Sequence, residues 1–202
     1  MTSFASRLPR LVVLSALFVA VVASESRAAA LDDALGEGWN AWRVAADMIR
    51  TTRCCYSWSI GQPTMQACDL DRRTAVSVVQ DNTAPDHGEM QLYALIESGR
   101  ATRILALSPQ CPVSTMSGIS DLGLLESGTS LDWLHGYVTR DDRLSEDSLA
   151  AIAAHSGSVN ALIGIVENRS LPMGIREQAL FWMAQSDYDE AFDFFTSILA
   201  RN

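Results

Sequence analysis

Four cysteines are the residues of this chain best suited to chemistry: Cys54, Cys55, Cys68 and Cys111. Cysteines pair as disulfides in oxidising compartments, bind zinc as thiolates, or attack other disulfides as redox nucleophiles. Structural zinc sites usually take pairs of ligands spaced two to four residues apart. The adjacent Cys54-Cys55 and the single Cys68 lack that spacing, which leaves disulfides or redox chemistry as the alternatives.

The compartment is indicated by residues 1–29, which have the pattern of a secretory signal peptide. Arg7 and Arg10 precede an apolar run at Leu11–Ala23, and small residues follow at Ala28–Ala30. The run would rise about 20 Å as a helix, less than the roughly 30 Å hydrocarbon core of a bilayer. We therefore expect cleavage, a periplasmic or secreted location, and no membrane span in the mature chain.

An even number of cysteines in an exported chain favours disulfides over free thiols. A bond between the adjacent Cys54 and Cys55 would be strained. The remaining pairings join Cys54 and Cys55 separately to Cys68 and Cys111, and we favour Cys55–Cys68 with Cys54–Cys111.

The other reactive side chains match no catalytic or metal-binding motif. His87, His135 and His155 include no pair four residues apart, and the sequence contains no phosphate-binding loop, dinucleotide fingerprint or G-x-S-x-G turn. We interpret His155 as a cation that caps a helix end, and the acidic pair Asp141-Asp142 as a solvated loop. We predict no cofactor, no metal and no enzymatic activity.

Charge excludes further classes of partner. The chain has 24 acidic and 15 basic residues, all of the latter arginine, and a net charge of −9. Binding to nucleic-acid phosphates requires concentrated positive charge. We therefore expect a protein partner and no nucleic acid.

The segments that must position these residues divide at about residue 115. Residues 30–115 carry β signals, of which the clearest is a hairpin: Gln91–Glu97 and Ala101–Leu107 flank a turn at Ser98–Arg100, where Gly99 can adopt a positive φ. The β-branched segment Thr74–Val79 predicts another strand.

Two other segments of the first half are harder to assign. Residues 54–73 contain Gly61 and Pro63 and are interpreted as a loop. In residues 39–49, the apolar spacing favours a helix, although a strand stays possible.

Residues 116–202 have helical spacing and an internal similarity. A shift of 30 residues places Leu149 on Ala179, Ile152 on Trp182 and Ala153 on Met183. Paired helices with a period near 30 indicate an α-solenoid. Trp182 is then expected to lie in the repeat core.

Two segments resemble bacterial HEAT-like repeats: Arg176–Ser186 (REQALFWMAQS) and Ala150–His155 (AAIAAH). The mature chain also resembles exported bacterial HEAT-repeat proteins of unassigned function, through Trp39 and Trp42, the Cys54-Cys55 pair, Cys68 and Cys111-Pro112. The resemblance favours a strand near Trp39. We predict an α+β fold in which a small, disulfide-linked antiparallel β region (30–115) precedes a short α-solenoid of about two HEAT-like helical hairpins (116–202).

We therefore expect a non-enzymatic periplasmic protein-interaction module or scaffold. In the last helix, Tyr188, Phe192 and Thr196 are predicted to line a surface for partner binding or self-association. The residues predicted to point inward are Ala191, Phe194, Phe195 and Leu199. Burial of Phe192 in the core is the competing interpretation. The alternative function is a thiol-redox or enzyme-accessory protein that uses Cys54-Cys55.

Overall fold

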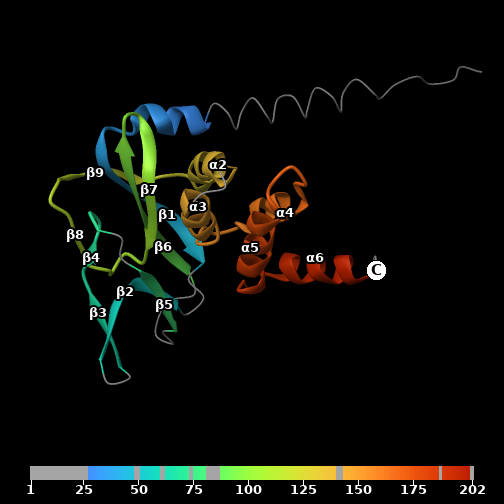
Figure 1. Ribbon diagram of the computed structural model, residues 1–202. Coiled ribbons are helices and arrows are strands. Elements are labelled where there is room, and N and C mark those ends of the chain that lie inside the picture. The colour runs from blue at the N-terminus through green and yellow to red at the C-terminus, as the bar shows by residue number, and fades with distance from the viewer. Residues whose placement is uncertain are drawn as a thin grey trace, which may run out of the picture.

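The computed structural model describes residues 27–47, 51–59, 62–72, 75–80, 87–139, 143–186 and 188–200. The described chain begins with helical residues 27–34, continues through nine strands, and ends with five further helices (Figure 1). The strands are β1 Gly38–Asp47, β2 Thr51–Ser59, β3 Gln62–Gln66, β4 Cys68–Asp69, β5 Val76–Gln80, β6 His87–Glu97, β7 Arg100–Leu107, β8 Val113–Ser114 and β9 Ile119–Leu124. The helices are α2 Ser127–Val138, α3 Arg143–Ile152, α4 Val159–Glu167, α5 Met173–Ala184 and α6 Asp189–Leu199.

A four-stranded sheet with the order β7-β6-β1-β9 forms the centre of the molecule. β6 and β7 are the predicted hairpin, and they pair antiparallel. Ser98 and Gly99 both have positive φ angles at its turn, 53° and 69°, which is the conformation that matches the twist of a two-residue hairpin. β9 pairs parallel to β1, on the side opposite β6.

The helical face of the sheet is the side that carries Trp42 and Val44. Both side chains are fully buried, and α2 and α3 pack over them. Trp42 meets Trp133 of α2 edge-to-face, with 5.4 Å between ring centroids. This face holds the larger hydrophobic cluster, which continues into the C-terminal helices.

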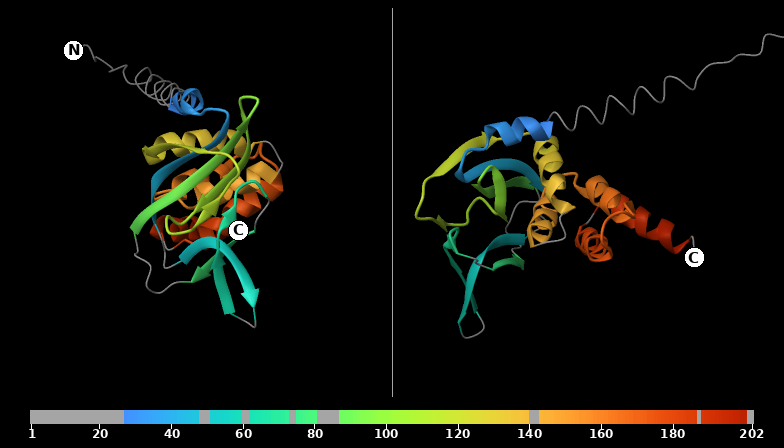
Figure 2. Two further views of the ribbon diagram at one scale, coloured as in Figure 1. Left: turned by 90° about the vertical axis from the view of Figure 1, so that its left-hand side faces the viewer. Right: turned by 45° about the horizontal axis from the view of Figure 1, so that its top comes forward.

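The disulfide face is the opposite side, which carries Trp39 and Ala41. A three-stranded sheet, β3-β2-β5, and the short β4-β8 pair lie on this side, and their buried residues form a smaller second cluster. The β2–β3 hairpin projects from one end of the molecule (Figure 2). Alternate residues of β1 therefore enter two separate cores, as expected for a strand that is covered on both sides.

Helices α4, α5 and α6 lie beyond α2 and α3, away from the sheet (Figure 1). α4 packs against α5 and α6, and α5 also contacts α3. The carboxylate of Asp47, at the end of β1, links this layer to the sheet by accepting hydrogen bonds from Ser156 Oγ (3.0 Å) and the Gly157 amide (3.3 Å).

The predicted fold class is wrong. The structure has sheets of four, three and two strands, and it is not a short solenoid that follows a small β region. The two segments that match after a shift of 30 residues pack differently: α3 packs on β7 and α2, whereas α5 packs on α4 and α3. The apolar stripe of a helix specifies which side is buried but not which element covers it. Two helices with similar stripes can therefore be buried in different layers.

Several segments differ from their sequence-based expectation. The segment from residue 39 is strand β1, in agreement with the resemblance and against the apolar spacing. The expected loop at 54–73 contains most of β2 and all of β3 and β4. Pro63 is compatible with a strand here because β3 is an edge strand.

Trp182 is not a core residue in the sense predicted. Ala179 and Met183 of the same helix are fully buried, whereas Trp182 is half-buried and packs against the outside of the larger cluster. The predicted signal segment lies outside the described residues as far as position 26. Within the described ranges, none of the helices has the length and apolar content needed to span a bilayer.

Candidate functional site

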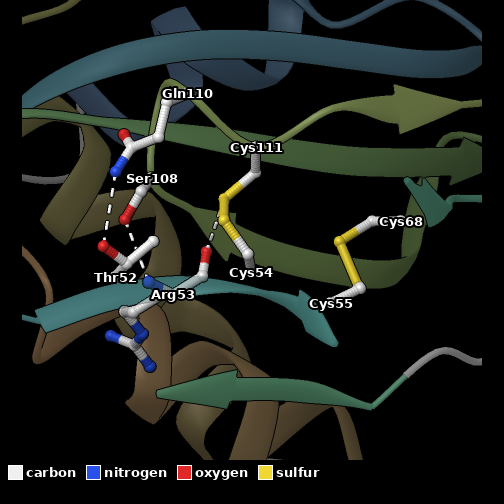
Figure 3. Close-up of a disulfide and its surroundings, with 8 residues drawn as sticks. All are labelled: Thr52, Arg53, Cys54, Cys55, Cys68, Ser108, Gln110 and Cys111. Atoms are coloured by element: carbon white, nitrogen blue, oxygen red, sulfur yellow. Dashed lines mark hydrogen bonds between the residues drawn. A yellow bond between two sulfur atoms is a disulfide. The ribbon is translucent and has the colours of Figure 1, made fainter. Parts of the chain in front are cut away.

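The cysteines form two disulfides, Cys54–Cys111 and Cys55–Cys68, with Cα–Cα distances of 5.5 and 5.2 Å (Figure 3). This is the favoured pairing, which the structure confirms, and no cysteine is left free. Both adjacent cysteines lie in β2. Neighbouring residues of a strand point to opposite faces, so these two side chains can reach different partners. Cys55 reaches the residue that opens β4, while Cys54 reaches the loop that follows β7.

All four sulfur-bearing side chains are buried. Cys54, Cys55 and Cys68 are 0% exposed, and Cys111 is 7% exposed. A redox-active cysteine requires an accessible sulfur and a neighbourhood that lowers its pKa. The two disulfides are instead structural cross-links that hold β2, β4 and the loop after β7 together in the smaller cluster.

His155 belongs to a buried hydrogen-bond chain that fixes its tautomer. Its Nδ1 is 2.8 Å from the Ala151 carbonyl oxygen, which only accepts, so Nδ1 carries the proton. Nε2 is 2.9 Å from Ser130 Oγ, and it accepts the hydroxyl proton. Ser130 in turn accepts from Trp42 Nε1 at 2.9 Å.

This chain of hydrogen bonds has a structural role. Burial lowers the pKa of His155 to about 4, so the imidazole is neutral at pH 7. His155 therefore caps α3 as a neutral donor and not as the cation expected from the sequence. Ser130 and His155 are both 1% exposed or less, and a substrate has no access to this pair.

Of the remaining histidines, His135 is exposed on α2, and the side chain of His87 lies outside the described set. Across the described residues, no three histidine, cysteine, aspartate or glutamate side chains gather closely enough to hold a metal ion.

The three residues predicted to bind a partner do not form one free surface. Tyr188 is half-buried; its hydroxyl donates to the Asp47 carboxylate and accepts from the Gly157 amide at 3.2 Å. Phe192 and Thr196 are exposed on α6. Tyr188 thus anchors the start of α6 to the end of β1, and the exposed surface begins one turn later.

Helix α6 leaves much of its apolar side uncovered. Ala191 is its one fully buried residue, Phe194, Phe195 and Ile198 are half-buried, and Phe192 and Leu199 are 71% and 76% exposed. Residues seven apart lie on the same side of a helix, so Phe192 and Leu199 form one edge, with Phe195 between them. We call Phe192, Phe195 and Leu199 the α6 edge.

The α6 edge is bordered by negative charge. Asp189, Glu190 and Asp193 are all exposed in the first half of the helix, and α6 contains no basic residue. The first two complement the positive end of the helix dipole. The sequence predicted that Leu199 points inward with Phe194 and Phe195, but this side chain is 76% exposed. Its spacing of seven from Phe192 places both residues on the same side of the helix.

No protein-family model, no curated protein and no solved structure matches this chain.

Proposed function

We propose that the protein is a non-enzymatic interaction module that works in the periplasm or outside the cell and presents the α6 edge to a partner protein. The observation that carries the proposal is the exposure of Phe192 and Leu199 on one edge of a helix that extends away from the sheet (Figure 1). Large apolar side chains grouped on one surface commonly mark binding sites.

The surroundings of the α6 edge define the chemistry of the partner. A helix that binds through anchors at positions i, i+3 and i+7 fits an apolar groove. The carboxylates of Asp189, Glu190 and Asp193 would lie at the border of such a groove. We therefore expect an apolar groove with arginine or lysine at its rim, and binding that weakens as salt rises.

The two disulfides support the proposed compartment, because structural disulfides persist in oxidising environments. They also favour an interaction module over the thiol-redox alternative. Cys54 and Cys55 are 0% exposed and both are bonded, so neither sulfur is placed to meet a substrate.

Phe192→Glu tests the proposal by placing a charge on one of the two exposed anchors of the α6 edge. The matched control is Met116→Glu, because Met116 is 95% exposed and lies far from α6 in the sequence. Crosslinked partners are captured from a periplasmic extract with the wild-type protein and both variants, and each candidate is then purified and its Kd is measured directly.

We expect a purified partner to bind the wild type and Met116→Glu with similar affinity, and Phe192→Glu at least about tenfold more weakly. The melting temperature of Phe192→Glu should stay close to that of the wild type, because Phe192 is exposed. Equal binding of all three proteins would refute the assignment of the α6 edge, and a large fall in melting temperature would show that Phe192 is a core residue.

A further inference from the structure

A cavity of about 280 Å³ lies where β2, β5, β7, α3 and α5 meet, and its lining includes none of the α6 edge residues. β7 is the edge strand of the four-stranded sheet, so the cavity runs along the border of the sheet. Its volume is at the lower end of the roughly 300–1,000 Å³ of ligand pockets. A ligand of about the size of an amino acid fits this space.

Arg53 of β2 is the main polar group of the cavity, and its backbone is firmly held. Its amide donates to Ser108 Oγ and its carbonyl accepts from the Ser108 amide, both at 3.0 Å (Figure 3). Ser108 is 1% exposed, and the Cys54–Cys111 disulfide joins the residue after Arg53 to a residue of the loop that begins at Ser108. The position of Arg53 is therefore fixed before any ligand arrives.

The guanidinium of Arg53 is only partly satisfied. Nη1 donates to the Ala150 carbonyl oxygen at 3.0 Å, but Nε is shielded from solvent and has no hydrogen-bond partner. Burial lowers the pKa of Arg53 to about 10, and the group stays charged at pH 7. Among the described residues, no carboxylate forms an ion pair with it.

Trp182 provides a second unpartnered donor in the same place. The Arg53 guanidinium lies over its indole ring, 5.1 Å from the ring centroid. The indole Nε1 is buried and has no acceptor. Buried polar groups are almost always hydrogen-bonded, and buried charges are almost always paired, so two orphaned donors on stacked side chains indicate that an acceptor is missing.

Arg143 and Asp147 are further charged residues that line the cavity within the described part of the chain. Arg143 lies at the start of α3 and is exposed, and Asp147 is half-buried. Arg103 also lines the cavity, but its guanidinium donates to the Leu70 and Arg72 carbonyl oxygens on the disulfide face.

We propose that this cavity binds the carboxylate of a small ligand with an apolar body, with Arg53 and the Trp182 indole N–H as its donors. A carboxylate has two oxygens and matches the fork of a guanidinium. Val76, Val78, Ile104 and Leu144 supply apolar walls for the rest of the ligand. The same carboxylate chemistry is offered by a free short-chain acid and by the C-terminus of a peptide.

The first test uses the wild-type protein and isothermal titration calorimetry. The probes are 4-methylpentanoate and its neutral isostere 4-methylpentanamide, followed by a leucine-terminated hexapeptide with either a free or an amidated C-terminus. We expect one or both carboxylates to bind at least about tenfold more tightly than the matching amide, because the amide lacks the charge that pairs with Arg53. The stronger carboxylate identifies the source of the ligand.

Two variants then assign the donors. Arg53→Gln should weaken carboxylate binding by about tenfold or more, and Trp182→Phe, which keeps an aromatic ring but removes the N–H, by roughly fivefold. Arg100→Gln, an exposed arginine in the β6–β7 turn region, is the matched control and should bind like the wild type. Melting curves of each variant show whether it is folded.

Equal affinity for acid and amide, or no binding of either carboxylate at ~10 mM, would overturn the proposal with the wild-type protein alone. Unchanged affinity in a folded Arg53→Gln would place the carboxylate elsewhere and would equally overturn it. Because no experiment here involves Phe192 or Leu199, these results are independent of the partner proposed for α6.

Discussion

On the helical side, the described residues bury 29 apolar side chains in one cluster, and on the disulfide side they bury ten, of which four are cysteines. Burial of apolar area is the main stabilising contribution to folding, and small cores contribute correspondingly less. The larger cluster is held by packing and by the Trp42–Ser130–His155 hydrogen bonds. The smaller cluster is held by covalent bonds, which shows how one sheet can support a core on each side when one of them is too small to be stable alone.

The largest effect is expected from Trp42→Ala on the helical face. Trp42 is 0% exposed, packs edge-to-face on Trp133, and donates to Ser130. We expect a loss of about 3–5 kcal/mol in the free energy of unfolding, because the substitution leaves a large cavity. Urea denaturation measures it, with Trp58→Ala as the control, since Trp58 is 64% exposed. Comparable losses in the two variants would contradict the burial difference.

A slightly smaller effect is expected on the disulfide face when Cys54 and Cys111 are both replaced by alanine. This bond closes a separation of 57 residues, and Cys55–Cys68 closes 13. The chain-entropy relation gives about 4 kcal/mol for the longer loop and about 3 kcal/mol for the shorter one. Thermal unfolding of the two double variants should therefore rank the Cys54–Cys111 loss first.

A thiol count accompanies the disulfide variants. The oxidised wild type should show no titratable thiol after denaturation, because all four cysteines are bonded. Two or more thiols per chain would refute the conclusion that disulfides hold the smaller cluster together. A melting temperature that does not change when a reductant is added would refute it as well.

The smallest of the three effects depends on pH and concerns only the helical face. The pKa of His155 is lowered from its ordinary 6.5 to about 4 by burial. The unfolded chain therefore binds more protons than the folded one between these values, and stability falls as the pH drops through that window. We expect His155 to account for a loss of about 3 kcal/mol between pH 7 and pH 4.

The contribution of His155 is measured by urea denaturation of the wild type and of His155→Gln at both pH values. Glutamine can keep neutral hydrogen bonds without titrating in this range, so the variant should lose less stability on acidification. The control is His135→Gln, which changes an exposed histidine. An acid response of His155→Gln equal to that of the wild type would show that the imidazole is not the buried group responsible.

Local signals in the sequence predicted the elements that have a single exposed side or a specific turn. The β6–β7 hairpin was predicted because Gly99 can adopt the positive φ that such a turn requires, and the structure adds a positive φ at Ser98. Strand β1 was ambiguous for a physical reason: Trp39 and Trp42 are buried on opposite faces of the sheet. Burial on both sides removes the alternation of a half-exposed strand, and a spacing of three resembles a helix.

The sequence did not show which elements pack against each other. The apolar stripes of α3 and α5 correctly indicated helices, but their similarity suggested a repeat although they pack on different layers. The Arg53 cavity could not be predicted from the sequence either, because Arg53, Arg143 and Trp182 come from three distant segments. Trp182 was assigned to the core on its spacing alone, and its half-exposed position became clear only with the guanidinium of Arg53 beside it.

The adjacency of Cys54 and Cys55 in β2 has a consequence for how this strand finds its alignment. Shifting the strand by one residue against β3 or β5 would exchange the two cysteines between faces, because side chains alternate. One cysteine would then occupy the other's place, opposite the wrong partner, and the second would lie one residue beyond its own place. Only the native alignment brings Cys54 to Cys111 and Cys55 to Cys68 at the same time. Once both bonds have formed, they hold β2 covalently in the correct alignment.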